Sequence, residues 1–454
     1  MNDRCDDQGI WQYVAGVESN ARTYARTFSK VFERGAGARM WDTDGVGYLD
    51  FLACAGSLPL GHNPPAVTDK VVNFVTSGHV LQALDMTTKP KYEFVRTLLD
   101  CLPEEFRVTA RLQFCGPSGA DAVEASMKLF KTATGRRSII AFNGAYHGMT
   151  LGALGLTGNL APKQNISGMA GEVHFFPYPN PARCSYGLSG SDSVQVALTH
   201  LERTLEDPES GITTPAMIIL EPVQGEGGCI PAPDEWLRGV RKIADRFDIP
   251  LVVDEIQTGF GRTGRMFAHE HAGIVPDAIL MSKAVGGGFP LSVIAYNKKF
   301  DKWMPGAHAG TFRGNQIAFV AGAETIKIIK ELGLPKRALE NGRILLDGLL
   351  KLKSKYDFIG DVRGRGLMCG MEIVDPNISQ TGNNFNGDLA KKLKGICFTK
   401  GLILETGGRF GAVVRFLPPL TVTDDEIRLA LTILDRSLSE AQESYQMSQV
   451  SEGV

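Results

Sequence analysis

Two polar residues stand just after predicted strands, where they could act on one small molecule. Asp254 follows the apolar run 249–253, and Lys283 comes one serine after the run 278–281. A carboxylate at the end of a buried strand can keep a pyridine-type nitrogen protonated, which turns the ring into an electron sink. A lysine in an apolar, glycine-rich segment is costly unless it is neutralised or used covalently. Together these residues predict covalent chemistry at Lys283 on a ring that Asp254 holds.

Two further segments could hold the rest of such a ligand. Ser118, Gly119 and Ala120 lie in a turn that leads into a predicted helix, so a hydroxyl and two backbone amides meet at a helix N-terminus. This arrangement favours a phosphate group. Tyr146 follows another predicted strand and offers a ring that can stack on a flat ligand. Each signal is weak alone, because serine often caps helices and tyrosine often packs at the rim of a core.

These residues need a scaffold that brings the ends of several strands together. β-Branched runs at 138–142, 216–220, 250–253 and 278–281 alternate with helical patterns such as 235–247. The alternation is typical of an α/β fold with a mostly parallel sheet covered by helices. Ligands in such folds bind at the carboxyl ends of the strands. Polar or glycine-rich residues follow nearly all of the runs, so the site is predicted at that edge.

The length of the chain predicts more than one packed unit. It has 454 residues, and single cores stop growing near roughly 250–300 residues. After Asn315 the strand-helix alternation gives way to two helical stretches and then to shorter strand-like pieces. We therefore predict an N-terminal segment (1–64) that is part of a small domain, a large ligand-binding domain (65–320) and a C-terminal small domain (321–454).

Charge and apolar patterning argue against large charged partners. The formal net charge is −2 and no run of Lys or Arg stands out, so neither a nucleic acid nor an anionic membrane surface is the expected partner. The longest apolar runs have the length of strands, far below the roughly 20 residues of a membrane helix. A small molecule is the expected partner.

The cysteines and the first residues predict a cytoplasmic location. The segment 1–7 is acidic and polar, where a secretory signal would carry basic and then apolar residues. The eight cysteines include no CxxC pair, which fits reduced thiols better than disulfides or a zinc site. No metal site is predicted.

These pieces, in this order, resemble the class III (ornithine and ω-amino-acid) aminotransferases of fold type I. The resemblance extends over nearly the whole chain, from 37–42 through 61–64 to 415–420, and it is specific because the runs 254–262 and 282–283 occur together. It implies an α/β fold with a large, mostly parallel sheet domain and a smaller α+β domain. It also implies pyridoxal 5′-phosphate (PLP) as cofactor and a homodimer with shared active sites.

The resemblance assigns roles residue by residue. It implies that Lys283 carries the cofactor as a Schiff base and shuttles a proton, while Asp254 pairs with the pyridine nitrogen; these two are the catalytic residues. Gln257 would bond the ring 3′-oxygen, and Thr311 would reach the phosphate of the neighbouring subunit. The implied cofactor-binding set is Ser118, Gly119, Ala120, Tyr146, His147, Glu221, Asp254, Gln257, Lys283 and Thr311.

Three residues bear on the substrate. Glu226 matches the family acid that can pair with the arginine at Arg415, and the pair could mask Arg415 while an ω-amine enters and then release it to an α-carboxylate. A Glu–Arg bridge between domains is also a common structural feature. Ornithine and 4-aminobutyrate enzymes commonly place an arginine where this chain has Met149. A carboxylate anchor is therefore missing from that wall.

Within the family, the segments 116–125 and 55–64 most resemble 2,4-diaminobutyrate aminotransferases. The predicted reaction moves an ω-amino group between L-2,4-diaminobutyrate and L-aspartate 4-semialdehyde, with glutamate and 2-oxoglutarate, or alanine and pyruvate, as the other pair. The alternatives are another ω-aminotransferase acting on ornithine, an acylated ornithine or a pathway-specific aldehyde, a PLP-dependent aminomutase, or a catalytically silent scaffold.

Overall fold

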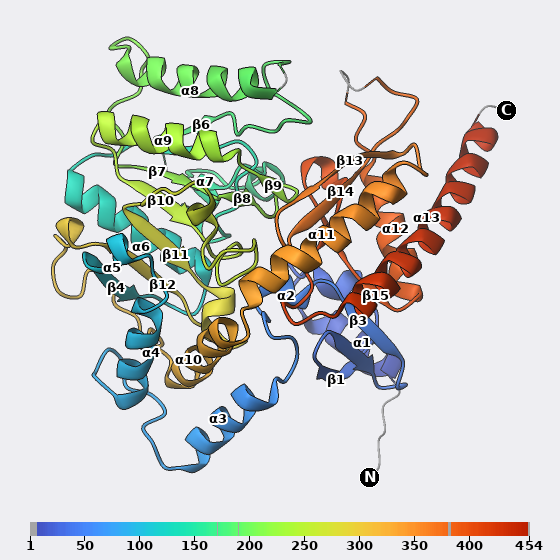
Figure 1. Cartoon of the computed structure of the whole chain (residues 1–454), viewed down its shortest axis with the longest axis horizontal. Coiled ribbons are helices and arrows are strands. Elements are labelled where there is room, and N and C mark those ends of the chain that lie inside the picture. Colours follow the sequence, from blue (N-terminus) through green and yellow to red (C-terminus); the bar gives the residue numbers. More distant parts are fainter. Residues whose placement is uncertain (1–6, 170, 189, 380–382, 453–454) are drawn as a thin grey trace.

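A seven-stranded sheet forms the centre of the larger part of the molecule (Figure 1). The computed structural model describes residues 7–169, 171–188, 190–379 and 383–452. Four neighbouring strand pairs are parallel, and the two pairs made by β12 are antiparallel. The strand order is β4 (Ala110–Phe114), β12 (Val293–Asn297), β11 (Ala278–Met281), β10 (Leu251–Asp254), β7 (Met217–Leu220), β5 (Ile139–Phe142) and β6 (Val173–Phe176).

Both faces of this sheet are covered by helices because its strands are apolar on both sides. In β7, Ile218 packs into a core with α8 and α9, while Ile219 packs into a second core with α6. In β10, Val253 likewise packs into the first core and Val252 into the second. Strands of a parallel sheet read as continuous apolar runs for this reason. The covering helices are α6 (Gly119–Thr134), α7 (Leu151–Leu156), α8 (Gly190–Glu206) and α9 (Asp234–Arg246).

A third group of helices covers the rim of the sheet beside β4. Helix α10 packs against α4 and α3 and also contacts the turn that carries Lys283. The large apolar side chains of Phe94 and Phe319 meet there, with ring centroids 5.0 Å apart. The helices are α3 (Pro65–Thr76), α4 (Lys89–Leu99), α5 (Glu104–Arg107) and α10 (Gln316–Glu331).

The last part of the chain builds a separate four-stranded antiparallel sheet. Figure 1 shows it beside the large sheet, with the long helix α11 running between the two parts. The elements are α11 (Leu334–Lys353), β13 (Ile359–Gly364), β14 (Cys369–Ile373), α12 (Gly387–Thr399), β16 (Glu405–Gly407), β17 (Val413–Phe416) and α13 (Asp424–Glu452), with strand order β13-β14-β17-β16.

The N-terminal strands join the C-terminal part rather than the large sheet. Strand β3 pairs in parallel with β15, so residues near 50 lie beside residues near 402. The helix α1 (Asp7–Val17) precedes this small sheet. Its strands are β1 (Phe32–Ala36), β2 (Arg39–Asp42), β3 (Gly47–Asp50) and β15 (Leu402–Ile403). The domain boundaries at 64 and 320 stay a prediction.

The predicted α/β fold is confirmed, and the four predicted strand runs form β5, β7, β10 and β11. Strand β6 was not predicted, and neither were β4 and β12. The pairing of β4 with β12 is antiparallel and β4 is only partly buried, so β4 lacks the continuous apolar run that marked the predicted strands. Among the described residues, no helix is long and apolar enough to cross a membrane.

Candidate active site

The topology brings Asp254 and Lys283 to one edge of the large sheet. Strand β10 ends at Asp254, and the neighbouring parallel strand β11 ends at Met281, with Ser282 and Lys283 directly after it. Carboxyl ends of adjacent parallel strands lie at the same edge, which is where ligands bind in open α/β sheets. The sequence-based expectation that these two residues lie together is met.

Asp254 is held in a fixed orientation. Its Oδ2 lies 2.8 Å from Nδ1 of His147, and its Oδ1 accepts a hydrogen bond of 3.0 Å from the backbone N–H of Ile256. Both Asp254 and His147 are buried. The outer nitrogen of His147, Nε2, is buried without a hydrogen-bond partner among the described residues. A buried carboxylate supported by one imidazole can present its charge to a cationic ring nitrogen.

Lys283 occupies a strained position. Its backbone φ is +48°, in the left-handed region that non-glycine residues rarely adopt. Burial lowers the pKa of Lys283, although the charge of Glu226 opposes this. No hydrogen bond or ion pair joins its Nζ to any residue that the structure describes. Strain of this kind persists where the surrounding structure over-determines it, often at functional sites.

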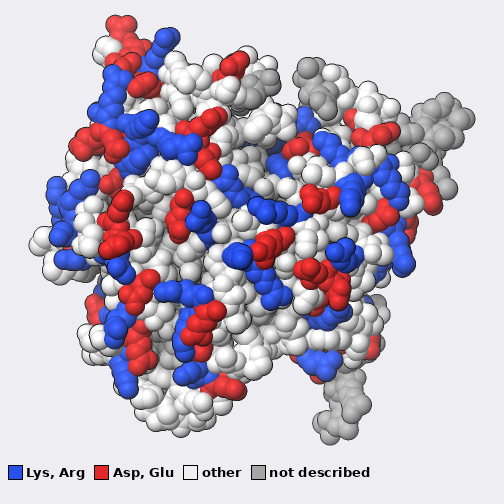
Figure 2. Space-filling view, in the orientation of Figure 1, with Lys and Arg blue, Asp and Glu red and all other residues white. Residues whose placement is uncertain are grey.

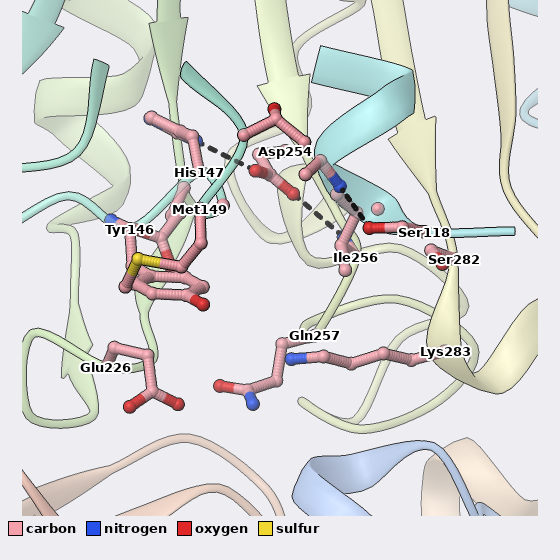
Figure 3. Close-up of a pocket in the computed structure, with 15 residues that line it drawn as sticks. Ser118, Tyr146, His147, Met149, Glu226, Asp254, Ile256, Gln257, Ser282 and Lys283 are labelled. Carbon is pink, nitrogen blue, oxygen red and sulfur yellow. Dashed lines mark hydrogen bonds and ion pairs between the residues drawn. The ribbon is translucent and has the colours of Figure 1, made fainter. Parts of the chain in front are cut away.

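A cavity of about 460 Å³ contains both groups. In Figure 3, Lys283 extends into the centre of this space, with Asp254 at its far end and Glu226 near its mouth. Thr311 and Arg415 do not line it, although the other predicted residues do. The lining residues are Ser118, Gly119, Ala120, Tyr146, His147, Gly148, Met149, Thr150, Glu221, Glu226, Asp254, Ile256, Gln257, Ser282 and Lys283.

The predicted phosphate turn opens into this cavity. Ser118 caps α6, and its Oγ accepts a hydrogen bond of 3.2 Å from the backbone N–H of Ala120. A β-carbon on Gly119 would come within 2.9 Å of the Ile256 side chain, so the turn closes tightly over the cavity. The first amides of a helix of this length form a ready-made site for a phosphate.

Two side chains face each other across the centre of the cavity. The ring of Tyr146 lies on one side and Ile256 lies on the other (Figure 3). A planar ring between them would contact an aromatic face and an aliphatic face. The sequence analysis found Tyr146 but missed Ile256. The signal was its position two residues after Asp254 in an otherwise polar run.

Glu226 and Arg415 form a bidentate ion pair at the mouth of the cavity. Arg415 Nη1 and Nη2 donate to Glu226 Oε1 and Oε2, each over 2.8 Å. The side chain of Arg415 is 1% exposed and that of Glu226 is 31% exposed. Burial alone would raise the pKa of Glu226, but Arg415 and Lys283 outweigh it and hold that pKa below its ordinary value. Arg415 Nε lacks a partner among the described residues, so its N–H is free to donate to a further oxygen.

Glu221 titrates close to neutrality. Its Oε1 and Oε2 accept backbone N–H groups of Tyr146 and Gly225, at 2.9 and 3.0 Å. Burial raises the pKa of Glu221 to about 7, and the nearby charge of Asp254 adds to this, although His147 opposes it. The residue therefore ties two loops of the cavity together and carries a proton for part of the time at neutral pH.

A left-handed turn supports Gln257 from below. Gln257 Nε2 donates over 3.0 Å to the carbonyl of Ala55, which lies in a turn where Ala53, Cys54 and Ala55 all have positive φ. Buried Asp50 holds this turn, since its Oδ1 accepts from the backbone N–H groups of Leu52 and Ala53 at 2.9 Å.

The other oxygen of Asp50 is also engaged. Its Oδ2 lies 2.8 Å from His62 Nε2. Sequence reasoning missed this support, because it joins residues whose roles depend on a backbone conformation that composition does not reveal.

Tyr24 is a second residue that the sequence analysis missed. Tyr24 is 44% exposed, yet partial burial of its phenol raises its pKa to about 12, and the charge of Glu226 contributes to this rise. Its phenol therefore stays protonated near the Glu226–Arg415 pair and can donate a hydrogen bond. Tyr24 precedes the first strand by several residues, in a segment without regular periodicity, so no sequence signal marked it.

Comparisons with known proteins bear directly on this site. The profile of the family described as Aminotransferase class-III matches residues 20–438. The chain belongs to this family. An enzyme of Rhizobium meliloti named Diaminobutyrate--2-oxoglutarate aminotransferase is 49% identical over 90% of this chain and 88% of its own. An enzyme of the same name from Haemophilus influenzae is 46% identical over 90% of each chain.

Solved structures agree on the fold. The ornithine aminotransferase of Toxoplasma gondii aligns with a TM-score of 0.81 at 25% identity, covering 96% of each chain. An (S)-enantioselective ω-transaminase of Thermomicrobium roseum aligns with a TM-score of 0.83 at 25% identity, covering 95% of this chain and 98% of the other. The class-III aminotransferases are PLP enzymes, so this chain is a PLP-dependent aminotransferase.

The residues present fit that cofactor. The buried Asp254 suits a protonated pyridine nitrogen, the N-terminus of α6 suits a phosphate, and the unpaired amine of Lys283 suits a covalent bond to an aldehyde. The space between Tyr146 and Ile256 suits a flat ring. Each part of the cofactor therefore meets a matching group on this chain.

Proposed function

We propose that this aminotransferase moves the ω-amino group of L-2,4-diaminobutyrate to 2-oxoglutarate and gives L-aspartate 4-semialdehyde and glutamate. The bidentate Glu226–Arg415 pair beside an unpaired Lys283 carries the proposal. While the pair is closed, the amine end of one substrate can reach Lys283, and when the pair opens, Arg415 can bind the carboxylate end of the other substrate at the same place. The 49% identity to an enzyme of that name supports the choice of substrate.

We assign the cofactor contacts to the residues that line the cavity. Lys283 would bind it covalently, and Asp254, oriented by His147, would pair with the ring nitrogen. Gln257 would bond the 3′-oxygen, and Tyr146 would stack on the ring. PLP supplies an electron sink that stabilises negative charge on the substrate carbon. Ser118, Gly119 and Ala120 would hold its phosphate at the start of α6.

Lys283 then acts as a general base and acid. Burial lowers the pKa of Lys283, which favours the neutral amine, the form that accepts a proton. With PLP bound, the Lys283 amine would take the proton from the substrate carbon that bears the transferred nitrogen and would return a proton later in the same half-reaction. Glu221 keeps the Tyr146 loop in place while this occurs.

Glu226 and Arg415 would sort the two substrates. While paired, Glu226 satisfies two of the three nitrogens of Arg415, so the arginine does not attract the carboxylate of the incoming diamine. The α-carboxylate of 2-oxoglutarate or glutamate would displace Glu226 and bind Arg415 bidentately. Met149 leaves the wall beside Tyr146 without a cation, and this argues against 4-aminobutyrate as the preferred amine.

We also propose a homodimer with shared active sites. Thr311 is exposed and lies away from the cavity of its own chain, so its phosphate contact would be to the neighbouring subunit. Exposed apolar side chains lie on the segment of Thr311 and on the segment near Asp85, including Phe312 on the first and Leu84 and Met86 on the second. Arg313 links the two segments through Asp85 at 2.5 Å. A second copy would cover this apolar surface.

A cytoplasmic location is proposed on the basis of the thiols. All cysteines among the described residues are free, and most of them are buried. Free thiols persist in reducing compartments.

The proposal is tested by half-reactions of the purified holoenzyme. L-2,4-diaminobutyrate should convert the cofactor from its aldehyde form to its amine form, seen as loss of visible absorbance, faster than ornithine or 4-aminobutyrate does. Lys283→Ala should abolish this conversion. If ornithine converted the cofactor and diaminobutyrate did not, the substrate assignment would be wrong. Addition of 2-oxoglutarate or pyruvate to the amine form then identifies the acceptor.

A further inference from the structure

A second pocket lies on the other side of the loop that carries Glu226. The loop joins β8 (Val223–Gln224) to β9 (Ile230–Pro231), and Glu226 lines the active-site cavity while Gly227 lines the second pocket. This second pocket has a volume of about 190 Å³, enough for a molecule of a few heavy atoms. We call it the guanidinium pocket.

Three arginines enter the guanidinium pocket, from both parts of the molecule. Arg183 comes from the large-sheet part, and Arg363 and Arg409 come from the C-terminal part. Arg183 Nε and Arg363 Nη1 share one buried carboxylate, Glu372, at 2.6 and 3.0 Å. Arg363 also pairs with Asp361 at 2.7 Å. Two carboxylates thus face three guanidinium groups.

Arg409 is the guanidinium without a counterion. Neither a hydrogen bond nor an ion pair joins its side chain to a residue in the described part of the chain. Arg409 is an exposed residue overall, but partial burial of its guanidinium and the like charge of Arg363 lower its pKa, although Glu372 opposes this. A cation kept beside another cation is unfavourable unless an anion compensates it. On the face of the molecule shown in Figure 2, Lys and Arg are interspersed with Asp and Glu.

The position of Arg409 is fixed by close packing. A β-carbon on Gly144 would overlap Arg409 Nη1, so the guanidinium lies against the backbone two residues before Tyr146. Gly408 directly precedes Arg409, and its backbone N–H donates over 2.7 Å to the carbonyl of Glu226. Arg409 therefore sits between two loops that form the active site.

We propose that the guanidinium pocket binds a small oxyanion, a phosphate or a carboxylate, through Arg409 and the unused N–H groups of Arg183 and Arg363. Arg183 Nη1 and Arg363 Nη2 make no hydrogen bond to the residues that the structure describes, so both can donate to a ligand. Guanidinium groups bind both oxyanions bidentately. The bound anion bridges the two parts of the molecule behind Glu226. This site is independent of the substrate proposed above.

Binding to the holoenzyme tests the proposal. Inorganic phosphate and succinate are titrated by isothermal calorimetry at constant ionic strength set with sodium chloride, in the wild type and in Arg409→Gln. We expect a dissociation constant of about 1 mM or below for at least one of the two anions, weakened about tenfold or more in Arg409→Gln. Tighter phosphate identifies a free phosphate as the ligand, and tighter succinate identifies a carboxylate.

Two variants complete the test. Arg436→Gln removes an exposed arginine of α13 and should leave the affinity unchanged. Arg409→Lys retains the charge without the bidentate fork, so its affinity should be intermediate; it replaces Arg409→Gln if that variant does not fold. Equal affinity in all variants, or no saturable binding beyond that of chloride, would overturn the proposal. If an anion still binds to Arg409→Gln with unchanged affinity, it binds at Arg415 in the active site, and the proposal is also overturned.

Discussion

Replacing Glu226 with Gln isolates the role of the ion pair at the mouth of the cavity. Glu226 and Arg415 are joined by two bonds of 2.8 Å, and the Arg415 side chain is 1% exposed. Removing one partner of a fully buried pair costs about 3–5 kcal/mol. Glu226 is 31% exposed and Gln keeps one acceptor oxygen, so we expect the free energy of unfolding to fall by only about 1–3 kcal/mol.

The same substitution should make 2-oxoglutarate bind more tightly. In the wild type, an incoming carboxylate must displace the charged Glu226 from Arg415, which costs free energy. If the substitution removes about 1–2 kcal/mol of this displacement cost, the dissociation constant of 2-oxoglutarate falls about 5–30-fold. The enzyme should also become less selective for the C4 amine of diaminobutyrate, because Arg415 can now bind the α-carboxylate of this substrate. Single-turnover absorbance and product analysis measure both effects.

The control is Glu209→Gln, which alters an exposed glutamate that does not line the cavity and should change neither the free energy of unfolding nor the dissociation constant of 2-oxoglutarate. If Glu226→Gln lowered stability yet left the 2-oxoglutarate dissociation constant within twofold of the wild type, the pair would be structural and the sorting role would be refuted.

Three further substitutions probe other parts of the site. Met149→Arg adds a cation to a half-exposed wall, so kcat/KM for 4-aminobutyrate should rise up to about tenfold; no change would remove Met149 from the specificity argument. Asp50→Ala removes three hydrogen bonds of the turn below Gln257 and should lower stability by about 2–4 kcal/mol and weaken cofactor binding, which equilibrium dialysis measures; unchanged cofactor affinity would contradict the positioning role. The pKa of Glu221 is raised to about 7, so its contribution to stability is present below about pH 4.5 and is lost as pH rises through 7. Between pH 5 and 8, the free energy of unfolding of the cofactor-free wild type, measured in urea, should fall by about 3 kcal/mol more than that of Glu221→Gln. If the two proteins show the same pH dependence, this titration of Glu221 is excluded.

The sequence predicted the parts of the fold and site that depend on local order. Asp254 and Lys283 were found because each follows an apolar run, and parallel strands end at one edge of a sheet. Ser118 was found because a capping residue precedes a helical pattern. Strands β4 and β6 were missed because each is only partly buried and partly polar; the apolar run of β12 was not assigned to a strand, although it ends at Asn297.

The missed site residues depend on distant contacts. The position of Ile256 after Asp254 was a sequence signal, but only the tertiary structure places its side chain opposite Tyr146. Asp50 and Ala55 act through a left-handed turn of non-glycine residues, which sequence propensity does not predict. Arg409 is notable only because the carboxylates near it already have other partners.

The most direct test of the proposed reaction follows the nitrogen atom. The holoenzyme is incubated with L-2,4-diaminobutyrate carrying ¹⁵N only on its C4 amine, together with unlabelled 2-oxoglutarate, and the products are analysed by mass spectrometry. The reaction proposed here predicts ¹⁵N in glutamate and none in the semialdehyde product. Unlabelled glutamate would show transfer of the α-amine, and no glutamate at all would exclude this pair of substrates.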